Sequence, residues 1–220
     1  MKMKLYTAGV VAALVISSSG VIAYEQELLG GPSPVPVDSL LTVHPILVPG
    51  PRLSPIEEAL LNPRKFKPVP PKRIDSETLW LARVIFSETK RPEEQVLVAW
   101  VVRNRVDTQY RGKDTYEGVI LDPYQFSAFR PGSPKAVHYA SLTATSQVPG
   151  WQTALRIAYA VRHSEPRHRP FSARTRHFYS ERSLNGVDAP EWAMGMTPVD
   201  IGYESIDVEH DRFRFFEDVS

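Results

Sequence analysis

One glutamate in the chain has the sequence setting of a catalytic acid. Glu88 is predicted to share one face of a helix with three apolar side chains, those of Leu81, Val84 and Ile85. A carboxyl group there, near the C-terminal end of the helix, loses hydration and meets the negative end of the helix dipole. Both effects raise its pKa. A carboxyl that is protonated at neutral pH can donate a proton to the oxygen of a glycosidic bond.

Two other interpretations of the acidic residues stay open. Glu88 could be a structural glutamate that reaches solvent or pairs with Arg83, Lys90 or Arg91. Glycosidases of the ordinary retaining or inverting kind need a second carboxylate. The acids considered for that role are Asp107, Asp114, Asp122, Asp188 and Glu191. None stands out, because Asp114 is predicted to cap a helix with Glu117 and Asp122 precedes a proline turn.

Four residues have side chains suited to binding a sugar. Gln125 and Ser127 lie on a predicted loop after Asp122-Pro123, where an amide and a hydroxyl can form hydrogen bonds with acetamido groups or sugar hydroxyls. Tyr179 and Trp192 can stack on the faces of sugar rings, or Tyr179 can orient the glutamate through its hydroxyl. Loop capping is the alternative for the first pair and core packing for the second.

Helices are predicted to position most of these residues. Asp75 or Ser76 can cap a helix that runs to about Lys90, and Pro92 opens a second helix that runs to about Val106. Asn104 and Arg105 end that second helix, and we expect them to tie helix ends and loops together rather than to act in catalysis. A further helix is predicted from Trp151 to about His163.

The last third of the chain changes character. Residues 176–179 and 212–216 bunch or alternate aromatic side chains as strands do, and glycines punctuate the stretch between them. Helices followed by a few strands predict an α+β domain with a small antiparallel sheet near the C-terminus.

The N-terminal third predicts an export signal and a linker. Residues 1–23 combine Lys2 and Lys4 with an apolar run and small residues at a cleavage site, and a retained membrane anchor is the alternative. Eleven of the 20 prolines lie between Pro32 and Pro71, so residues 24–73 are predicted to be a proline-rich linker, of which residues 24–71 are expected to be dispensable for catalysis. One short capped helix is expected within it, and the catalytic domain is expected to span residues 74–220.

Composition narrows the function further. The chain has 220 residues and no cysteine, so a disulfide framework, a thiolate zinc site and a cysteine nucleophile are excluded. Its net charge is +1 from 26 basic and 25 acidic residues, and loss of Lys2 and Lys4 with the signal leaves 24 against 25, or −1. Net charge therefore gives no support for nucleic-acid binding. No metal or cofactor motif is found, and we expect neither.

Four segments resemble one family in the order in which they occur. Residues 81–88, Leu-Ala-Arg-Val-Ile-Phe-Ser-Glu, are similar to the opening motif of the spore-cortex-lytic type of cell wall hydrolase. Residues 96–106 resemble its second helix with an Asn-Arg ending, residues 118–120 and 125–129 its third block, and residues 177–179 with 190–193 its closing block. The loop Thr89–Pro92 departs from the pattern, because it is two residues shorter and lacks a glycine.

This resemblance implies a lysozyme-like helical core and lytic transglycosylase activity on the bond between N-acetylmuramic acid and N-acetylglucosamine in peptidoglycan. It implies one catalytic glutamate, Glu88, and favours binding roles for Gln125, Ser127, Tyr179 and Trp192. It also implies action in the periplasm or outside the cell. A hydrolytic muramidase with a second carboxylate and a catalytically weak peptidoglycan-binding protein are the alternatives. The sequence does not predict an oligomeric state.

Overall fold

The computed structural model describes residues 54–65, 67–184, 186, 188–201 and 212–219. These residues belong to one compact unit that runs from Pro49 to Ser220. The expected signal or anchor, residues 1–23, and most of the expected linker lie outside the described residues. None of the described helices is long and apolar enough to cross a membrane.

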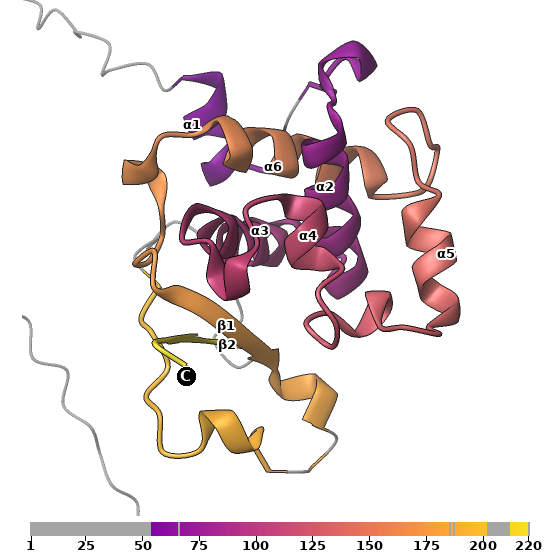
Figure 1. Ribbon diagram of the computed structural model, residues 1–220. Coiled ribbons are helices and arrows are strands. Elements are labelled where there is room, and N and C mark those ends of the chain that lie inside the picture. Colours follow the sequence, from indigo (N-terminus) through magenta and orange to yellow (C-terminus); the bar gives the residue numbers. More distant parts are fainter. Residues whose placement is uncertain (1–53, 66, 185, 187, 202–211, 220) are drawn as a thin grey trace, which may run out of the picture. The chain divides into compact units, whose positions relative to one another are not determined.

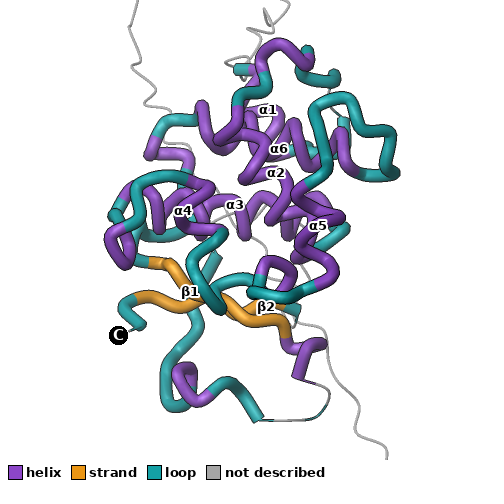
Figure 2. Tube along the Cα trace, turned by 45° about the vertical axis from the view of Figure 1, so that its right-hand side comes forward, coloured by secondary structure: helices purple, strands orange, loops and turns teal. Residues whose placement is uncertain are grey.

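The described residues form an α+β fold, as predicted (Figure 1). Its α-helices are α1 (Pro55–Leu61), α2 (Ser76–Glu88), α3 (Pro92–Asp107), α4 (Tyr116–Ile120), α5 (Pro134–Ala140) and α6 (Trp151–His163). Its strands, β1 (Thr175–Ser180) and β2 (Phe213–Glu217), form a two-stranded antiparallel sheet near the C-terminus. Figure 2 shows the α-helices gathered on one side of this sheet, with the short helical turns that follow β1, Glu181–Leu184 and Glu191–Ala193, on the other.

Helix α3 lies at the centre of the hydrophobic core. It contacts α2, α4, α6 and β1, and every residue from Val96 to Val102 is fully buried. The helix begins at Pro92, whose fixed φ suits a first helical position, and Glu93 and Glu94 in its first turn complement the helix dipole. A helix that is apolar on all sides is stable only inside the protein, so the other helices and the sheet surround it.

Helix α2 is amphipathic as predicted. The side chain of Asp75 caps it by accepting a hydrogen bond from the Thr78 backbone N–H at 2.8 Å. Leu81, Val84 and Ile85 are fully buried on the face that packs against α6 and α3. The helix ends at Glu88 rather than near Lys90, because Thr89 adopts an extended conformation and the chain turns toward α3.

The cap of α4 corrects one prediction. Asp114 was expected to cap this helix, but the N-cap is Thr115, whose hydroxyl accepts a hydrogen bond from the Gly118 backbone N–H at 3.1 Å. Asp114 is exposed and lies one residue outside the helix. Threonine and aspartate are both good capping residues, so only the backbone conformation decides between neighbours of these types.

Helix α1 forms inside the stretch that the sequence predicts to be a linker. Its N-terminus has the predicted capping box, in which the Ser54 hydroxyl accepts from the Glu57 N–H and the Glu57 carboxylate accepts from the Ser54 N–H. Ala59 and Leu60 are buried in the core, where α1 contacts α6. The side chain of Arg64, just after α1, donates two hydrogen bonds to Glu93 of α3.

A truncation can test where the catalytic domain begins. A protein that starts at Lys72 lacks α1, and we expect it to be less stable than one that starts at Ser54 by about 2 kcal/mol, since burial of one leucine contributes roughly that amount. Urea titration of the two proteins measures the difference, and cleavage of soluble glycan shows whether the site survives. Equal stability would mean that α1 packs against α6 without stabilising the domain.

Candidate active site

Glu88 ends α2 with a carboxyl group that has no direct partner in the part of the chain that the structure describes. The side chain is partly buried, and no described residue forms a hydrogen bond or an ion pair with it. Two of the three cations that could have paired with it bind elsewhere, because Arg83 donates to the Leu142 carbonyl at 2.9 Å and Arg91 pairs with Glu94 at 3.4 Å. Lys90 donates to the Phe86 carbonyl and lies over the Phe86 ring.

Burial gives this carboxyl group an unusual acidity. The loss of hydration raises the pKa of Glu88 to about 7, against an opposing effect from the positive charges of Arg105, Lys135 and Lys90. Among the described residues, all the charges that act on Glu88 are therefore cations. Burial lowers the pKa of Lys90 to about 8, and the negative charge of Glu88 opposes this shift. Near neutral pH a proton can consequently be both given up and taken back by Glu88.

The loop between Glu88 and α3 is short but well fixed. The Thr89 hydroxyl donates to the buried carboxylate of Glu94, and the Gln95 amide donates to the Thr89 carbonyl at 2.8 Å. Glu94 is also paired with Arg212 at 2.7 Å. These contacts hold the end of α2 against the start of α3 and against Arg212, the residue that precedes β2. The short loop is therefore fixed by its neighbours.

The structure brings the four resembling segments together around Arg105. Its Nε donates to the Arg176 carbonyl in β1 at 2.7 Å, and its guanidinium lies 5.2 Å from the centre of the Phe126 ring. Its charge acts on Glu88 and on His177. Segments that are far apart in the sequence thus contact Arg105 or feel its charge.

Asn104 has the structural role that the sequence predicts. Its amide donates to the carbonyls of Ser172 and Thr175, each at 3.0 Å, and its carbonyl accepts from Arg169 at the same distance. The side chain is fully buried. It therefore ties the end of α3 to the start of β1.

A groove with predicted binding residues lies within electrostatic range of Glu88. It has a volume of about 410 Å³ and is lined by Tyr124, Ser127 and residues 130–135. Lys135 both lines this groove and acts on the charge of Glu88. Ser127 is exposed there, whereas Gln125 is half-buried beside it and its backbone N–H bonds to the Asp122 carbonyl.

Tyr179 of β1 and Trp192, which follows it in the chain, lie close together. Their rings are 6.0 Å apart, and both contact Phe216 of β2. Trp192 is 37% exposed and also lies 5.5 Å from the His177 ring. The positive charge of Arg105 acts on both His177 and Glu88. The aromatic cluster is therefore linked to Glu88 only indirectly, through His177 and Arg105. The structure thus brings Tyr179 and Trp192 together and puts Ser127 in the groove, but none of the four predicted binding residues contacts Glu88 directly among the described interactions.

Sequence reasoning missed Tyr124 and Lys135. The ring of Tyr124 is 78% exposed, and its backbone has a positive φ of 66° that is uncommon for any residue other than glycine. Lys135 lies on α5, which the sequence analysis did not predict. The available signal was Pro134 after Ser133, a pair typical of a helix start. No sequence signal marks Tyr124.

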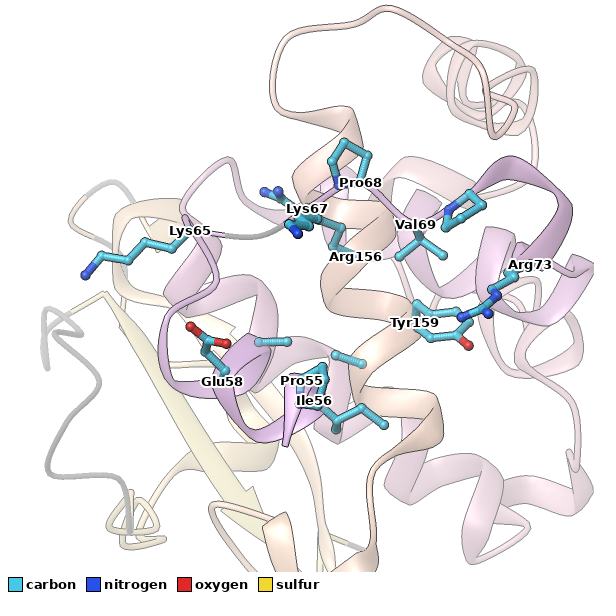
Figure 3. A pocket seen from close by; sticks show the side chains of 13 residues that line it. Pro55, Ile56, Glu58, Lys65, Lys67, Pro68, Val69, Arg73, Arg156 and Tyr159 are labelled. Carbon is cyan, nitrogen blue, oxygen red and sulfur yellow. The ribbon is translucent and has the colours of Figure 1, made fainter. Parts of the chain in front are cut away.

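A larger cavity lies elsewhere in the domain. It measures about 470 Å³ and is lined by residues of α1, of α6 and of the stretch between α1 and α2 (Figure 3). Its lining includes Ile56, Arg156 and Tyr159, and none of its lining residues acts on the charge of Glu88. We therefore place the candidate chemistry at Glu88, on whose charge Lys135 of the groove acts. Among the described residues no group of three or more histidine or acidic side chains could hold a metal ion.

Comparison with known families decides the class of the protein. The family model described as Cell Wall Hydrolase matches residues 89–202, which is just over half of the chain. This chain is a member of the cell wall hydrolase family. No curated protein and no solved structure gives a significant match.

Membership of the cell wall hydrolase family gives the site a substrate. The family indicates that the protein cleaves peptidoglycan and acts on it outside the cytoplasm. The matched region contains Arg105, the groove, Tyr179 and Trp192, but it begins one residue after Glu88 and ends before Phe216. The role of Glu88 in this cell wall hydrolase therefore rests on its surroundings, and not on the match.

Proposed function

We propose that this cell wall hydrolase is a lytic transglycosylase that uses Glu88 as its only catalytic acid and base. Its target is the bond between N-acetylmuramic acid and N-acetylglucosamine. The observation that carries the proposal is the setting of Glu88, a carboxyl group with a pKa of about 7 that is surrounded, among the described residues, by positive charges alone.

The reaction has two steps that one carboxyl group can serve. First, protonated Glu88 donates its proton to the glycosidic oxygen, the bond from that oxygen to C1 of the muramic acid breaks, and N-acetylglucosamine leaves with a free hydroxyl. Second, the Glu88 carboxylate takes the proton from the C6 hydroxyl of the muramic acid as the C6 oxygen bonds to C1. The product is a 1,6-anhydro ring, no water is consumed, and Glu88 ends protonated as it began.

A hydrolytic muramidase is the second candidate, and the described acids give it little support. Such an enzyme needs a second carboxylate at a defined separation from the first. Asp107 is paired with Arg169 and Arg103, and Asp122 is paired with Arg111 at 2.6 Å. Asp114, Asp188 and Glu191 are exposed. None of these acids acts on the charge of Glu88.

We also propose that the groove and the aromatic cluster hold the glycan on either side of the broken bond. Ser127 supplies hydrogen bonds from the groove and Gln125, two residues earlier in the chain, adds its amide, while Tyr179 with Trp192 supplies an aromatic surface on which a sugar ring can stack. A groove of this volume can accept a sugar unit, since ligand sites of small molecules begin near about 300 Å³.

The N-terminal residues complete the proposal. Residues 1–23 are proposed to direct export, either as a cleaved signal or as a retained anchor. Residues 24–73 are proposed to separate this segment from the catalytic domain at 74–220, and α1 within them packs on that domain. Mass spectrometry of the protein recovered from its native envelope distinguishes a cleaved from a retained N-terminus.

The mass of the products tests the reaction itself. We expect digestion of purified sacculi by the full protein to release fragments that end in 1,6-anhydro-muramic acid, each lighter by one water than the corresponding reducing end. Reducing ends alone would show a muramidase and would reject the transglycosylase proposal. A lack of any product, with binding to sacculi retained, would show a peptidoglycan-binding protein.

A further inference from the structure

Arg105 is a buried cation at the point where the site segments meet. Only 4% of its surface is exposed. Besides its bond to the Arg176 carbonyl, its guanidinium lies 5.7 Å from the ring of Tyr110 and 5.2 Å from that of Phe126. Aromatic rings surround this charge without neutralising it, because each ring offers only the weak attraction of its π face.

The positive charge of Arg105 lacks a paired carboxylate among the described residues. No acidic oxygen lies within ion-pair distance of it, and its Nη1 atom is buried without a hydrogen-bond partner. Burial lowers the pKa of Arg105 to about 10, so the side chain is still charged at neutral pH. An unpaired buried charge is costly for folding, and such a group in a candidate site calls for a functional explanation.

The neighbouring arginines show what a structural role looks like in this region. Arg103, two residues earlier on α3, pairs with Asp107 and donates to the carbonyls of Val161 and Ser164. Arg169 pairs with the same aspartate and donates to Asn104. Both have a carboxylate and fixed acceptors. Among the described residues Arg105 has a single carbonyl acceptor, and its buried Nη1 atom has no hydrogen-bond partner.

We propose that Arg105 is a positioning residue that acts through Glu88, its guanidinium stabilising the carboxylate that Glu88 becomes after it has given up its proton. The inference rests on the proposed function, in which the same group must act first as an acid and then as a base. Burial favours only the first of these forms. A fixed positive charge nearby favours the second, and it brings the two forms close enough in energy for the carboxyl group to alternate between them.

The other charges around Glu88 are less suited to this role. Lys135, on α5, is exposed, so water and salt screen its effect, and the ammonium of Lys90, after α2, is already bound by the Phe86 carbonyl. The charge of Arg105 is buried and is the largest of the three charge effects on Glu88, and a charge acts more strongly in a low-dielectric interior. The groups that face Arg105 itself are Tyr110, Asp122 and Arg176, and His177 also feels its charge. Asp122 is already paired with Arg111.

The pH dependence of activity separates this role from a purely structural one. We expect the wild-type rate on soluble glycan to fall as the pH rises above about 7, because Glu88 loses its proton there. Arg105→Met removes the charge that lowers the pKa of Glu88. The alkaline limb of the pH–rate profile should therefore move to higher pH by about one unit. The maximal rate should fall by at least about tenfold, as is typical when electrostatic stabilisation is lost from a site. Arg105→Lys keeps the charge and should keep the limb near its wild-type position.

Arg103→Met is the matched control. It also removes a cation from α3, and it should lower stability without moving the alkaline limb, because Arg103 does not act on Glu88. Circular dichroism verifies the fold of each variant. If Arg105→Met does not fold, Arg105→Gln replaces it, since the amide can still donate to the Arg176 carbonyl.

A titration that needs no turnover completes the test. Carbon NMR of the Glu88 carboxyl, assigned by comparison with Glu88→Gln, should give a higher pKa in Arg105→Met than in the wild type. An unchanged pKa and an unmoved alkaline limb would overturn the inference, even if activity is lost. A wild-type protein that releases no product, or an active Glu88→Gln variant, would instead reject the proposed function and leave the titration result standing by itself.

Discussion

Glu88→Gln should release no measurable product from purified sacculi while folding like the wild type. Glutamine has the size and shape of glutamate but has no proton to donate to the glycosidic oxygen. General acid–base catalysis is typically worth about 10²–10⁴-fold, and here one group serves both steps, so we expect a loss at the upper end of that range or beyond it. Timed release of soluble fragments, followed by chromatography, measures the residual rate.

Glu77→Gln provides the matched control for that experiment. Glu77 lies on the same helix in the first turn, where its carboxylate accepts a hydrogen bond from the Tyr116 backbone N–H at 2.7 Å. The carbonyl of a glutamine can still accept this bond, and the residue is far along the helix from Glu88. Its variant should cleave at close to the wild-type rate. Activity near the wild-type level in Glu88→Gln would falsify the assignment of the catalytic acid.

The same Glu88→Gln substitution should stabilise the protein at alkaline pH. Burial raises the pKa of Glu88 from 4.5 to about 7 in the folded state. Between these two values the folded state holds a proton that the unfolded state has lost, so the free energy of unfolding of the wild type falls as the pH rises through this window. Above pH 7 the buried carboxylate is charged, and it lowers the free energy of unfolding by as much as about 3 kcal/mol, at 1.36 kcal/mol per pKa unit. The neutral amide of glutamine avoids it.

Thermal or urea unfolding at two pH values measures this effect. At pH 4 the wild type and Glu88→Gln should have nearly equal stability, and at pH 8 the variant should be the more stable. Glu77→Gln should show no such change between the two pH values. Equal stabilities of Glu88→Gln and wild type at pH 8 would mean that the carboxyl group is well solvated, and its role as a buried acid would then lose its physical basis.

Local patterns in the sequence predicted the elements that carry the site. The spacing of Leu81, Val84 and Ile85 identified the buried face of α2, and Asp75 is confirmed as its cap. The capping box of Ser54 and Glu57 is confirmed as well. Each of these signals depends on residues within one or two helical turns of one another, so the sequence contains all that is needed to detect them.

Features that depend on distant contacts could not be predicted in the same way. The contact of α1 with α6 depends on Leu60 meeting a helix about 90 residues later, and the proline-rich composition around α1 pointed to a linker. The buried state of Arg105 is set by Tyr110, Phe126 and the Arg176 carbonyl together. Its position at the end of a helix predicted a structural role, since no local pattern reports that a charge lacks a partner.

The position of β2 near the end of the chain has a consequence for when the enzyme becomes active. Phe215 of β2 lies in the core against Phe171 and Phe178, and β1 has no other strand to pair with among the described residues. Asn104 must also close a loop of 71 residues to reach Thr175. Such long-range contacts form late in folding, after local helices such as α2 and α3. We therefore expect Glu88 to gain its finished surroundings only once residues 213–217 are in place, so that a growing or partly translocated chain stays inactive toward the wall.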